Sequence, residues 1–240
     1  LGELDRIISS YGNSVQVVVA GDIFMGGLDP VETFEWVRRR AGELFTLGNH
    51  DDYALMVGPK EGPNPPYTEA GAYQRLSAEQ LEDFKSYSGM LELLWRGKRI
   101  RVMHGHFTPS GECTPFPIKP SEQTRLFADP EMDLTIVAHS HYPYVAEQDG
   151  TMVANSGSTA GLFIGARQGD GTVLPMGEEP EFIPPAQIYS TYLLLSTQGC
   201  ELNVSVERFD YDRAAVIERL REAGDRGVEG KRDWLMKAIG

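Results

Sequence analysis

Apolar residues recur at helical spacing in Leu1–Tyr11, and a dense run of β-branched residues follows in Val15–Ala20. The first pattern predicts an amphipathic helix, and the second predicts a strand buried on both faces. Asp29 then precedes a proline and Glu32, an arrangement that predicts an N-cap, an N1 proline and an N3 carboxylate at the start of a helix. Leu44–Leu47 predicts a short strand. This order of strand, helix and strand favours a parallel α/β unit.

Hairpin patterns characterise the second half of the chain. Strand-like runs flank the turn dipeptides Gly97-Lys98 and Asp149-Gly150, and each such pair predicts a β-hairpin. Two more strands are expected at Ile188–Ser196 and Leu202–Phe209. Stretches rich in proline and glycine predict long loops at Gly58–Tyr67, Thr108–Pro120 and Gly165–Pro185.

Three further elements complete the pattern. Ser77 and Gln80 form a capping box that predicts a helix, Leu134–Ala138 predicts a buried strand, and a last helix is expected over residues 212–223. Parallel pairing early and hairpins late predict an α/β fold, a four-layer α-β-β-α sandwich of two mixed β-sheets flanked by helices. We expect residues 1–240 to form a single domain.

Charge and composition restrict the classes of function that the chain can have. The formal net charge is −13, which disfavours general binding to a nucleic-acid backbone. No apolar run approaches the roughly 18 residues of a membrane span, and no signal-peptide pattern opens the sequence. Cys113 and Cys200 are far apart and are expected to be reduced thiols of a cytoplasmic protein. A phosphate-bearing substrate would need local positive charge, which bound metal ions can supply.

The five histidines are distributed in a regular way. Each follows a strand-like run and is expected in a loop; they are His50, His104, His106, His139 and His141. Ligand sites of parallel α/β sheets lie at the carboxyl ends of the strands, so we expect these side chains to converge. A nitrogen- and oxygen-rich set without thiolate suits Mn, Fe, Zn, Ni or Mg.

The histidines occur in short motifs with other metal-binding side chains. Asp22 follows a glycine, and Asn49 precedes His50 and Asp51. On an extended chain, the His-x-His spacing points both imidazoles the same way, one toward each of two adjacent metals. Two dications about 3.5–4 Å apart repel each other, so a bridging carboxylate is required. Asp22 is the expected bridge.

The ordered set Gly-Asp, Gly-Asn-His-Asp, His-Gly-His and His-x-His resembles the calcineurin-like metallophosphoesterases over about Val17–Asp212. It is most similar to the small bacterial and archaeal phosphodiesterases and the diadenosine-tetraphosphatase-like members. Two segments resemble that subgroup in particular, Gly26–Pro30 and Asn155–Ser158, where Ser156 replaces a proline.

The resemblance implies two divalent metal ions and a role for each motif residue. Asp22 would bridge the ions, while Asn49, His104 and His139 would complete one of them and His141 would serve the other. His50 would donate to a phosphoryl oxygen and help to protonate the leaving group, with Asp51 orienting it. The ions would lower the pKa of a water molecule to generate the nucleophile.

The sequence departs from the family in two places. Ala138 stands before the His-x-His segment, where the family normally has glycine. The family also opens with a strand that ends in Asp-x-His, and no histidine precedes Asp22 here. Because such a strand rises about 3.3 Å per residue across the sheet, we expect the natural protein to have roughly 10–20 residues before Leu1.

The resemblance predicts a hydrolase of phosphodiester or phosphoanhydride bonds in small nucleotide-like substrates. The alternative is a non-catalytic metal-binding or protein-interaction scaffold, a role that a retromer subunit of this fold fulfils. A protein phosphatase fits less well, because no pair of arginines accompanies the motifs. His106 contacts the substrate or caps its loop, and Arg167 reaches a phosphate or is solvated. The pattern defines no oligomeric state.

Overall fold

The structure of the protein, a computed structural model, describes residues 1–59, 62–115, 118–160, 165–167, 173–175 and 190–223. The chain forms two units, of which the first comprises Leu1–Leu91 with the segment from Tyr211 and the second Glu92–Asp210. The expected single domain over residues 1–240 stays a prediction.

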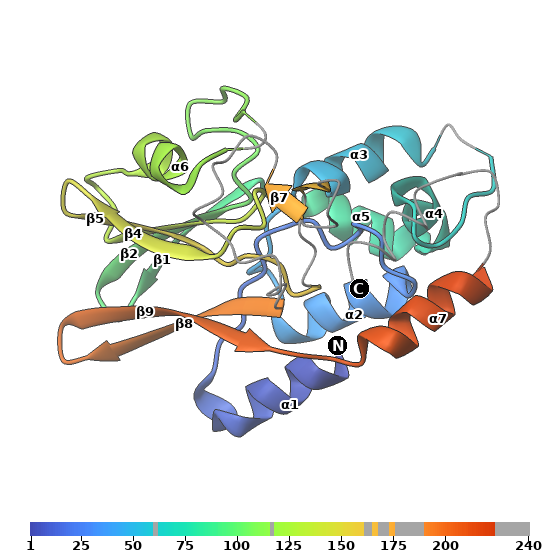
Figure 1. Ribbon diagram of the computed structural model, residues 1–240, viewed down its shortest axis with the longest axis horizontal. Coiled ribbons are helices and arrows are strands. Elements are labelled where there is room, and N and C mark those ends of the chain that lie inside the picture. Colours follow the sequence, from blue (N-terminus) through green and yellow to red (C-terminus); the bar gives the residue numbers. More distant parts are fainter. Residues whose placement is uncertain (60–61, 116–117, 161–164, 168–172, 176–189, 224–240) are drawn as a thin grey trace. The chain divides into compact units, whose positions relative to one another are not determined.

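Helices make up most of the first unit (Figure 1). They are α1 (Gly2–Ser10), the 3-10 helix η1 (Gly12–Ser14), α2 (Pro30–Arg40), α3 (Asn49–Val57), α4 (Glu69–Arg75), α5 (Ala78–Ser86) and α7 (Arg213–Ala223). The helices predicted from apolar spacing and capping patterns are α1, α2, α5 and α7. The helices α3 and α4 were not predicted, since the first turn of α3 consists of the motif residues Asn49, His50 and Asp51 and α4 has only seven residues.

Short parallel bridges connect the extended segments of the first unit. Val19 pairs with Phe45, and Thr46 pairs with Ser88, both in parallel orientation. The predicted parallel connection between the segments at Val19 and Phe45 is therefore present. The prediction of a strand over Val15–Ala20 was wrong, since only Val19 forms a bridge in this segment. A strand forms only where another strand pairs with it along its length. In this segment Val15 and Val18 are each 36% exposed, so the expected burial on both faces is missing.

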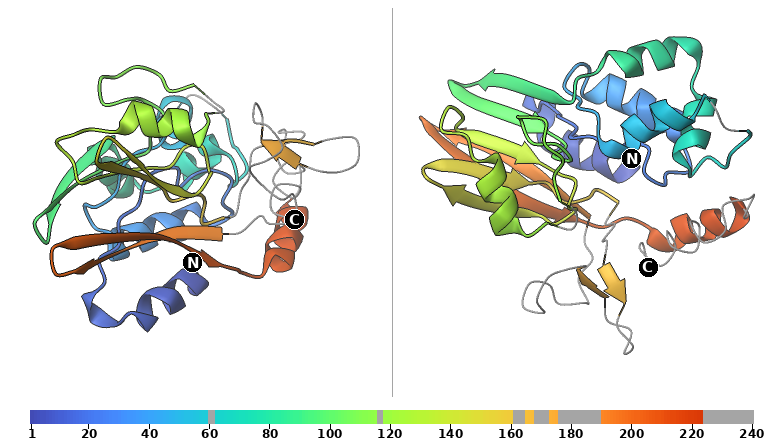
Figure 2. Two further views of the ribbon diagram at one scale, coloured as in Figure 1. Left: turned by 60° about the vertical axis from the view of Figure 1, so that its left-hand side comes forward. Right: turned by 90° about the horizontal axis from the view of Figure 1, so that it is seen from above.

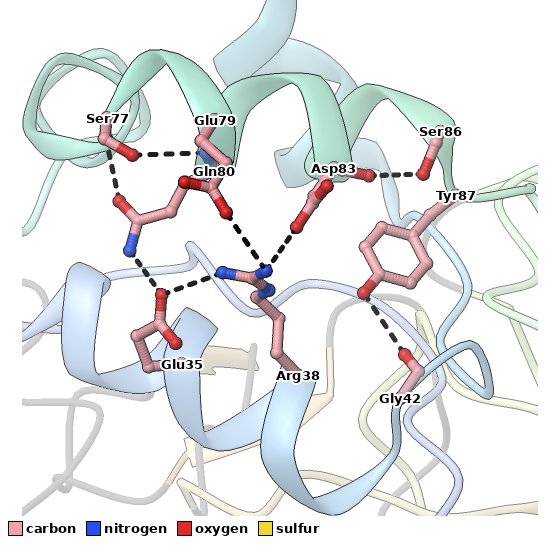
Figure 3. A network of polar contacts seen from close by, with 9 residues as sticks. All are labelled: Glu35, Arg38, Gly42, Ser77, Glu79, Gln80, Asp83, Ser86 and Tyr87. Carbon is pink, nitrogen blue, oxygen red and sulfur yellow. Dashed lines mark hydrogen bonds and ion pairs between the residues drawn. The ribbon is translucent and has the colours of Figure 1, made fainter.

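Polar contacts join α2 and α5 (Figure 3). Ser77 and Gln80 form the predicted capping box at the start of α5. The Gln80 amide also donates to Glu35 of α2 at 2.6 Å, and Arg38 of α2 forms an ion pair with Asp83 of α5 at 2.6 Å. The capping residue Gln80 and Asp83 therefore hold α5 against α2.

Asp29 is the N-cap residue of α2 but does not act as predicted. In the described part of the chain its carboxylate makes no capping hydrogen bond to α2. Instead it accepts two hydrogen bonds from the Arg219 guanidinium of α7, at 2.8 and 2.6 Å. This bidentate contact lowers the pKa of Asp29 and links α7 to the beginning of α2.

A mixed five-stranded sheet forms the centre of the second unit, in the order β1-β2-β3-β5-β4. The strands are β1 (Met90–Trp95), β2 (Lys98–Met103), β3 (Leu134–Val137), β4 (Tyr144–Gln148) and β5 (Thr151–Asn155). β2, β3 and β5 are parallel, whereas β4 and β5 are antiparallel. Arg96 and Asp149, each followed by glycine, have positive φ, as tight hairpin turns require.

In the described ranges of the second unit, one helix and two hairpins accompany this sheet. α6 (Pro120–Phe127), which was not predicted, contacts β4 and β5. β8 (Ser190–Gln198) and β9 (Glu201–Phe209) form a separate long hairpin (Figure 2). β6 (Gly165–Arg167) pairs with β7 (Val173–Pro175). The predicted α/β class, with a mixed sheet, a second sheet and accompanying helices, is confirmed.

Two further sequence expectations concern the cellular setting. None of the helices in the described ranges combines the length and apolarity that crossing a bilayer requires. Cys113 and Cys200, which were expected to be reduced, are both free, and both are exposed.

The core of the first unit depends on an aromatic cluster centred on Phe84. This ring lies 4.9 Å from the ring of Phe24 and 5.7 Å from that of Phe34, centroid to centroid, and all three side chains are buried. We expect Phe84→Ala to lower the free energy of unfolding by about 3–5 kcal/mol, because the cluster cannot refill the space. Urea unfolding would measure this change.

Leu94→Ala is the control, because Leu94 is 78% exposed and should change stability by at most about 0.5 kcal/mol. Equal losses in the two variants would contradict the assignment of the core.

Candidate metal centre

Asp22 lies in a tight turn directly after the segment that pairs with Phe45. Its φ is 58°, a left-handed conformation that costs a non-glycine residue free energy and is found mostly where surrounding contacts impose it. Two contacts hold it: its backbone N–H donates to Asp51 Oδ2 at 2.7 Å, and its Oδ1 accepts from the His50 N–H at 2.9 Å. The Asp22 carboxylate is thus fixed against the first turn of α3.

Asp51 is fully buried, and its carboxylate supports the turn that contains Asp22. In addition to the Asp22 N–H, its carboxylate accepts hydrogen bonds from the N–H groups of Gly48 at 2.9 Å and Phe24 at 3.4 Å. The expectation that His50 lies in a loop was wrong, since Asn49, His50 and Asp51 form the first turn of α3. A carboxylate suits this position, because the first N–H groups of a helix lack partners within it.

Gly48 allows the close approach of Asp22 to α3. A Cβ atom at this position would lie 2.1 Å from Asp22 Oδ1 and 2.6 Å from its backbone nitrogen, both impossibly short. Any side chain at residue 48 must therefore displace the Asp22 carboxylate or the helix that supports it.

His50 contacts a carboxylate that was not predicted from the sequence. Its Nδ1 lies 2.8 Å from Oε1 of Glu69, the first residue of α4. Glu69 is 19 positions away from His50, in a segment without a motif, and nothing in its local pattern indicates this contact.

Three histidines gather in the second unit. The ring centroids of His104 and His139 are 5.3 Å apart, and that of His106 lies 5.5 Å from His104 and 6.2 Å from His139. They follow β2 and β3, which are parallel neighbours, and the Ala138 N–H donates to the His104 carbonyl at 2.9 Å. Within this unit the carboxyl ends of the strands do bring the imidazoles together.

The segment from His139 to His141 is not extended. His139 has a φ of 49° and His141 a φ of 58°, both in the left-handed region, so the argument from a period of two was wrong for this pair. Backbone strain of this kind persists where neighbouring groups determine the conformation.

A buried amide network holds this turn in place. Asn155, at the end of β5, donates from Nδ2 to the Ala138 carbonyl at 2.5 Å and to Ser140 Oγ at 3.0 Å. The same amide lies 3.0 Å from Oε1 of Gln123 on α6, which also accepts from the Tyr144 hydroxyl at 3.1 Å. Burial raises the pKa of Tyr144 to about 12, so this hydroxyl remains a donor. Asn155, the first residue of the segment Asn155–Ser158, therefore supports the turn that carries His139 and His141.

Each unit carries side chains of types that can bind metal ions. The first contains the carboxylate of Asp22 and the amide of Asn49, and the second contains imidazoles. Carboxylate, amide and imidazole groups each suit divalent ions of intermediate hardness. Within the described residues, no group of three or more His, Cys, Asp or Glu side chains is placed to hold an ion. Arg167 ends β6, and its side chain lies outside what the structure describes.

Residues 2–174 match the family model for the calcineurin-like phosphoesterase superfamily domain. The chain belongs to this superfamily. Membership makes it a metal-dependent phosphoesterase in general type and confirms the resemblance seen in the sequence motifs.

Two solved structures share the calcineurin-like fold with the chain. A hypothetical protein, PH1004, from Pyrococcus horikoshii OT3 is 16% identical with a TM-score of 0.65, and the match covers 99% of this chain and 91% of that one. A metallophosphoesterase from Sphaerobacter thermophilus is 19% identical with a TM-score of 0.62, covering 98% and 94%. No curated protein matches the chain significantly.

The close approach at Gly48 gives a direct test of the calcineurin-like site. We expect Gly48→Ala to weaken metal binding by about 10–100-fold, the usual effect of disturbing the support of a ligand. Titration of the metal-free protein with Mn²⁺ in a calorimeter would measure the affinity.

Gly89→Ala is the matched control, because a Cβ at Gly89 meets nothing within 4 Å. If both variants bound Mn²⁺ as tightly as the wild type, Asp22 would not be a ligand held in this position.

Proposed function

We propose that the chain is a two-metal phosphodiesterase that hydrolyses phosphodiester or phosphoanhydride bonds of small nucleotide-like substrates. The observation that carries the proposal is the support of Asp22, whose backbone and carboxylate are both fixed by the first turn of α3. Backbone strain of this kind concentrates at functional sites. A bridging metal ligand also needs neighbours that fix its backbone and its carboxylate, as those of Asp22 are fixed.

We assign metal-ligand roles to five residues. Asp22 would be shared by two divalent ions, of which Mn²⁺ is our first candidate. Asn49, His104 and His139 would hold one ion, and His141 would hold the other. When bound, the ions would supply positive charge beside the phosphoryl oxygens and would lower the pKa of water enough to provide a nucleophile at neutral pH.

The protein side chains perform the remaining steps. His50 donates a hydrogen bond to a phosphoryl oxygen and helps to protonate the leaving group. His106, 5.5 Å from the His104 ring, is the candidate for contact with the substrate beside the metals, and Arg167 is a second candidate. With a net charge of −13 the protein does not attract polyanions from a distance, so short-range contacts must select a small substrate.

The contact between His50 and Glu69 favours an enzyme over a scaffold. A scaffold that only binds metal has no use for a histidine that is not a ligand and that a buried carboxylate holds in place. The free thiols of Cys113 and Cys200 support a cytoplasmic location as part of this proposal.

Removal of the metal should abolish the activity. We expect chelated protein to be inactive on a chromogenic phosphodiester and Mn²⁺ to restore turnover, whereas the double variant Asn49→Ala, His139→Ala should lose metal and stay inactive. The measurements are initial rates and elemental analysis of the purified wild type, before chelation, and of the double variant. Equal metal content in the two proteins would refute the ligand assignment, and faster turnover of a phosphoprotein than of any small diester would refute the substrate class.

His50 is expected to act on the reaction and not on the metal. His50→Ala should therefore lower kcat by about 10²–10⁴, the usual contribution of a positioned acid or base, with metal content unchanged. The control is a variant with a substitution at Tyr53, which is exposed and lies one turn further along α3. Loss of metal in His50→Ala would show that this residue is a ligand instead.

A further inference from the structure

Glu69 is the buried carboxylate that contacts His50. Its side chain is only 9% exposed, and its Oε1 lies 2.8 Å from Nδ1 of His50, whose side chain is 27% exposed. Removing a charged carboxylate from water is costly unless it gains a partner, and the imidazole is such a partner.

The loop before α4 fixes the position of Glu69. Thr68 caps the helix by accepting from the Gly71 N–H at 3.0 Å, and its hydroxyl donates to the Pro65 carbonyl at 2.8 Å. Gly71 is required here, because a Cβ would lie 1.8 Å from that same carbonyl oxygen. The predicted loop over Gly58–Tyr67 thus ends directly before the cap residue of α4, whose first residue is Glu69.

The residue next to His50 in sequence has another task. By resemblance, Asp51 was expected to orient His50, but its carboxylate accepts from the backbone N–H groups of Asp22, Gly48 and Phe24. Two buried carboxylates therefore serve two purposes, one on the Asp22 turn and one on the imidazole.

We propose that Glu69 is the positioning residue of His50, accepting the Nδ1–H so that Nε2 is the nitrogen presented to the substrate. In a neutral imidazole one nitrogen donates and the other accepts, and the partner of the first selects the tautomer. A carboxylate can only accept, so it selects the Nδ1–H form, and it also stabilises the ring when it carries a positive charge. This inference rests on the proposed function for the role of Nε2 but not for the state of the ring.

The first test is spectroscopic and needs no substrate. Nitrogen-15 NMR of metal-free protein labelled at histidine reports the tautomer of His50, assigned by its loss in His50→Ala. We expect the Nδ1–H form in the wild type and a shift toward the Nε2–H form in Glu69→Ala and in Glu69→Gln, which keeps the side-chain volume. The same tautomer in all three proteins would overturn the proposal, whether or not the protein is a phosphodiesterase.

The second test is a double-mutant cycle on the metal-loaded enzyme. Glu69→Gln should lower kcat by at least about tenfold, within the range of a positioned acid or base, with KM and metal content unchanged. Added to His50→Ala, the same change should have no further effect, because the two side chains act as one unit. Equal losses of kcat in both backgrounds would show that Glu69 does not act through His50.

Glu79→Gln is the matched control for these variants. Glu79 also lies in the first turn of a helix, α5, but its side chain is 82% exposed, so it should alter neither the tautomer nor the rate. If the wild type hydrolysed no diester, the proposed function would fail while the tautomer would still decide the role of Glu69.

Discussion

The buried carboxylate of Asp51 is the constraint on which the candidate site depends. It accepts hydrogen bonds from the backbone N–H groups of Asp22 and Gly48, at 2.7 and 2.9 Å. These bonds join the turn that contains Asp22 to the N-terminus of α3. Charge-assisted hydrogen bonds in a buried place are strong, and a helix N-terminus favours a negative group. Asp22 keeps a strained conformation because both sides of the turn are fixed in this way.

The same principle recurs in the second unit with neutral groups. There Asn155 and Gln123, both fully buried, hold the turn that carries His139 and His141. The turn of Asp22 and the turn of His139 and His141 each rest on a buried polar side chain that is not itself a candidate ligand. Such supports determine how precisely a metal site is preorganised, so they belong to the functional account as much as the ligands do.

Much of the fold followed from local patterns, whereas the supporting contacts did not. The hairpin at Asp149 and the capping box at Ser77 were predictable because turn and cap chemistry are local in sequence. The strand expected over Val15–Ala20 failed because strands depend on neighbours, and α3 was missed because its first turn was interpreted only as a metal motif. The motif residues were identifiable from their order, but Glu69 and Gln123 were not. Their partners lie far away in the chain, and each belongs to a residue type that is common on helices.

Our main proposal is that Asp22 and Asn49 share a pair of metal ions with His104, His139 and His141. Crystals of the Mn²⁺-loaded protein, measured at the manganese absorption edge, would show the ions and their ligands. We expect two anomalous peaks about 3.5–4 Å apart, with the Asp22 carboxylate and the three imidazoles among the ligands. A single peak, or peaks that lack either Asp22 or the imidazoles as ligands, would refute the proposal.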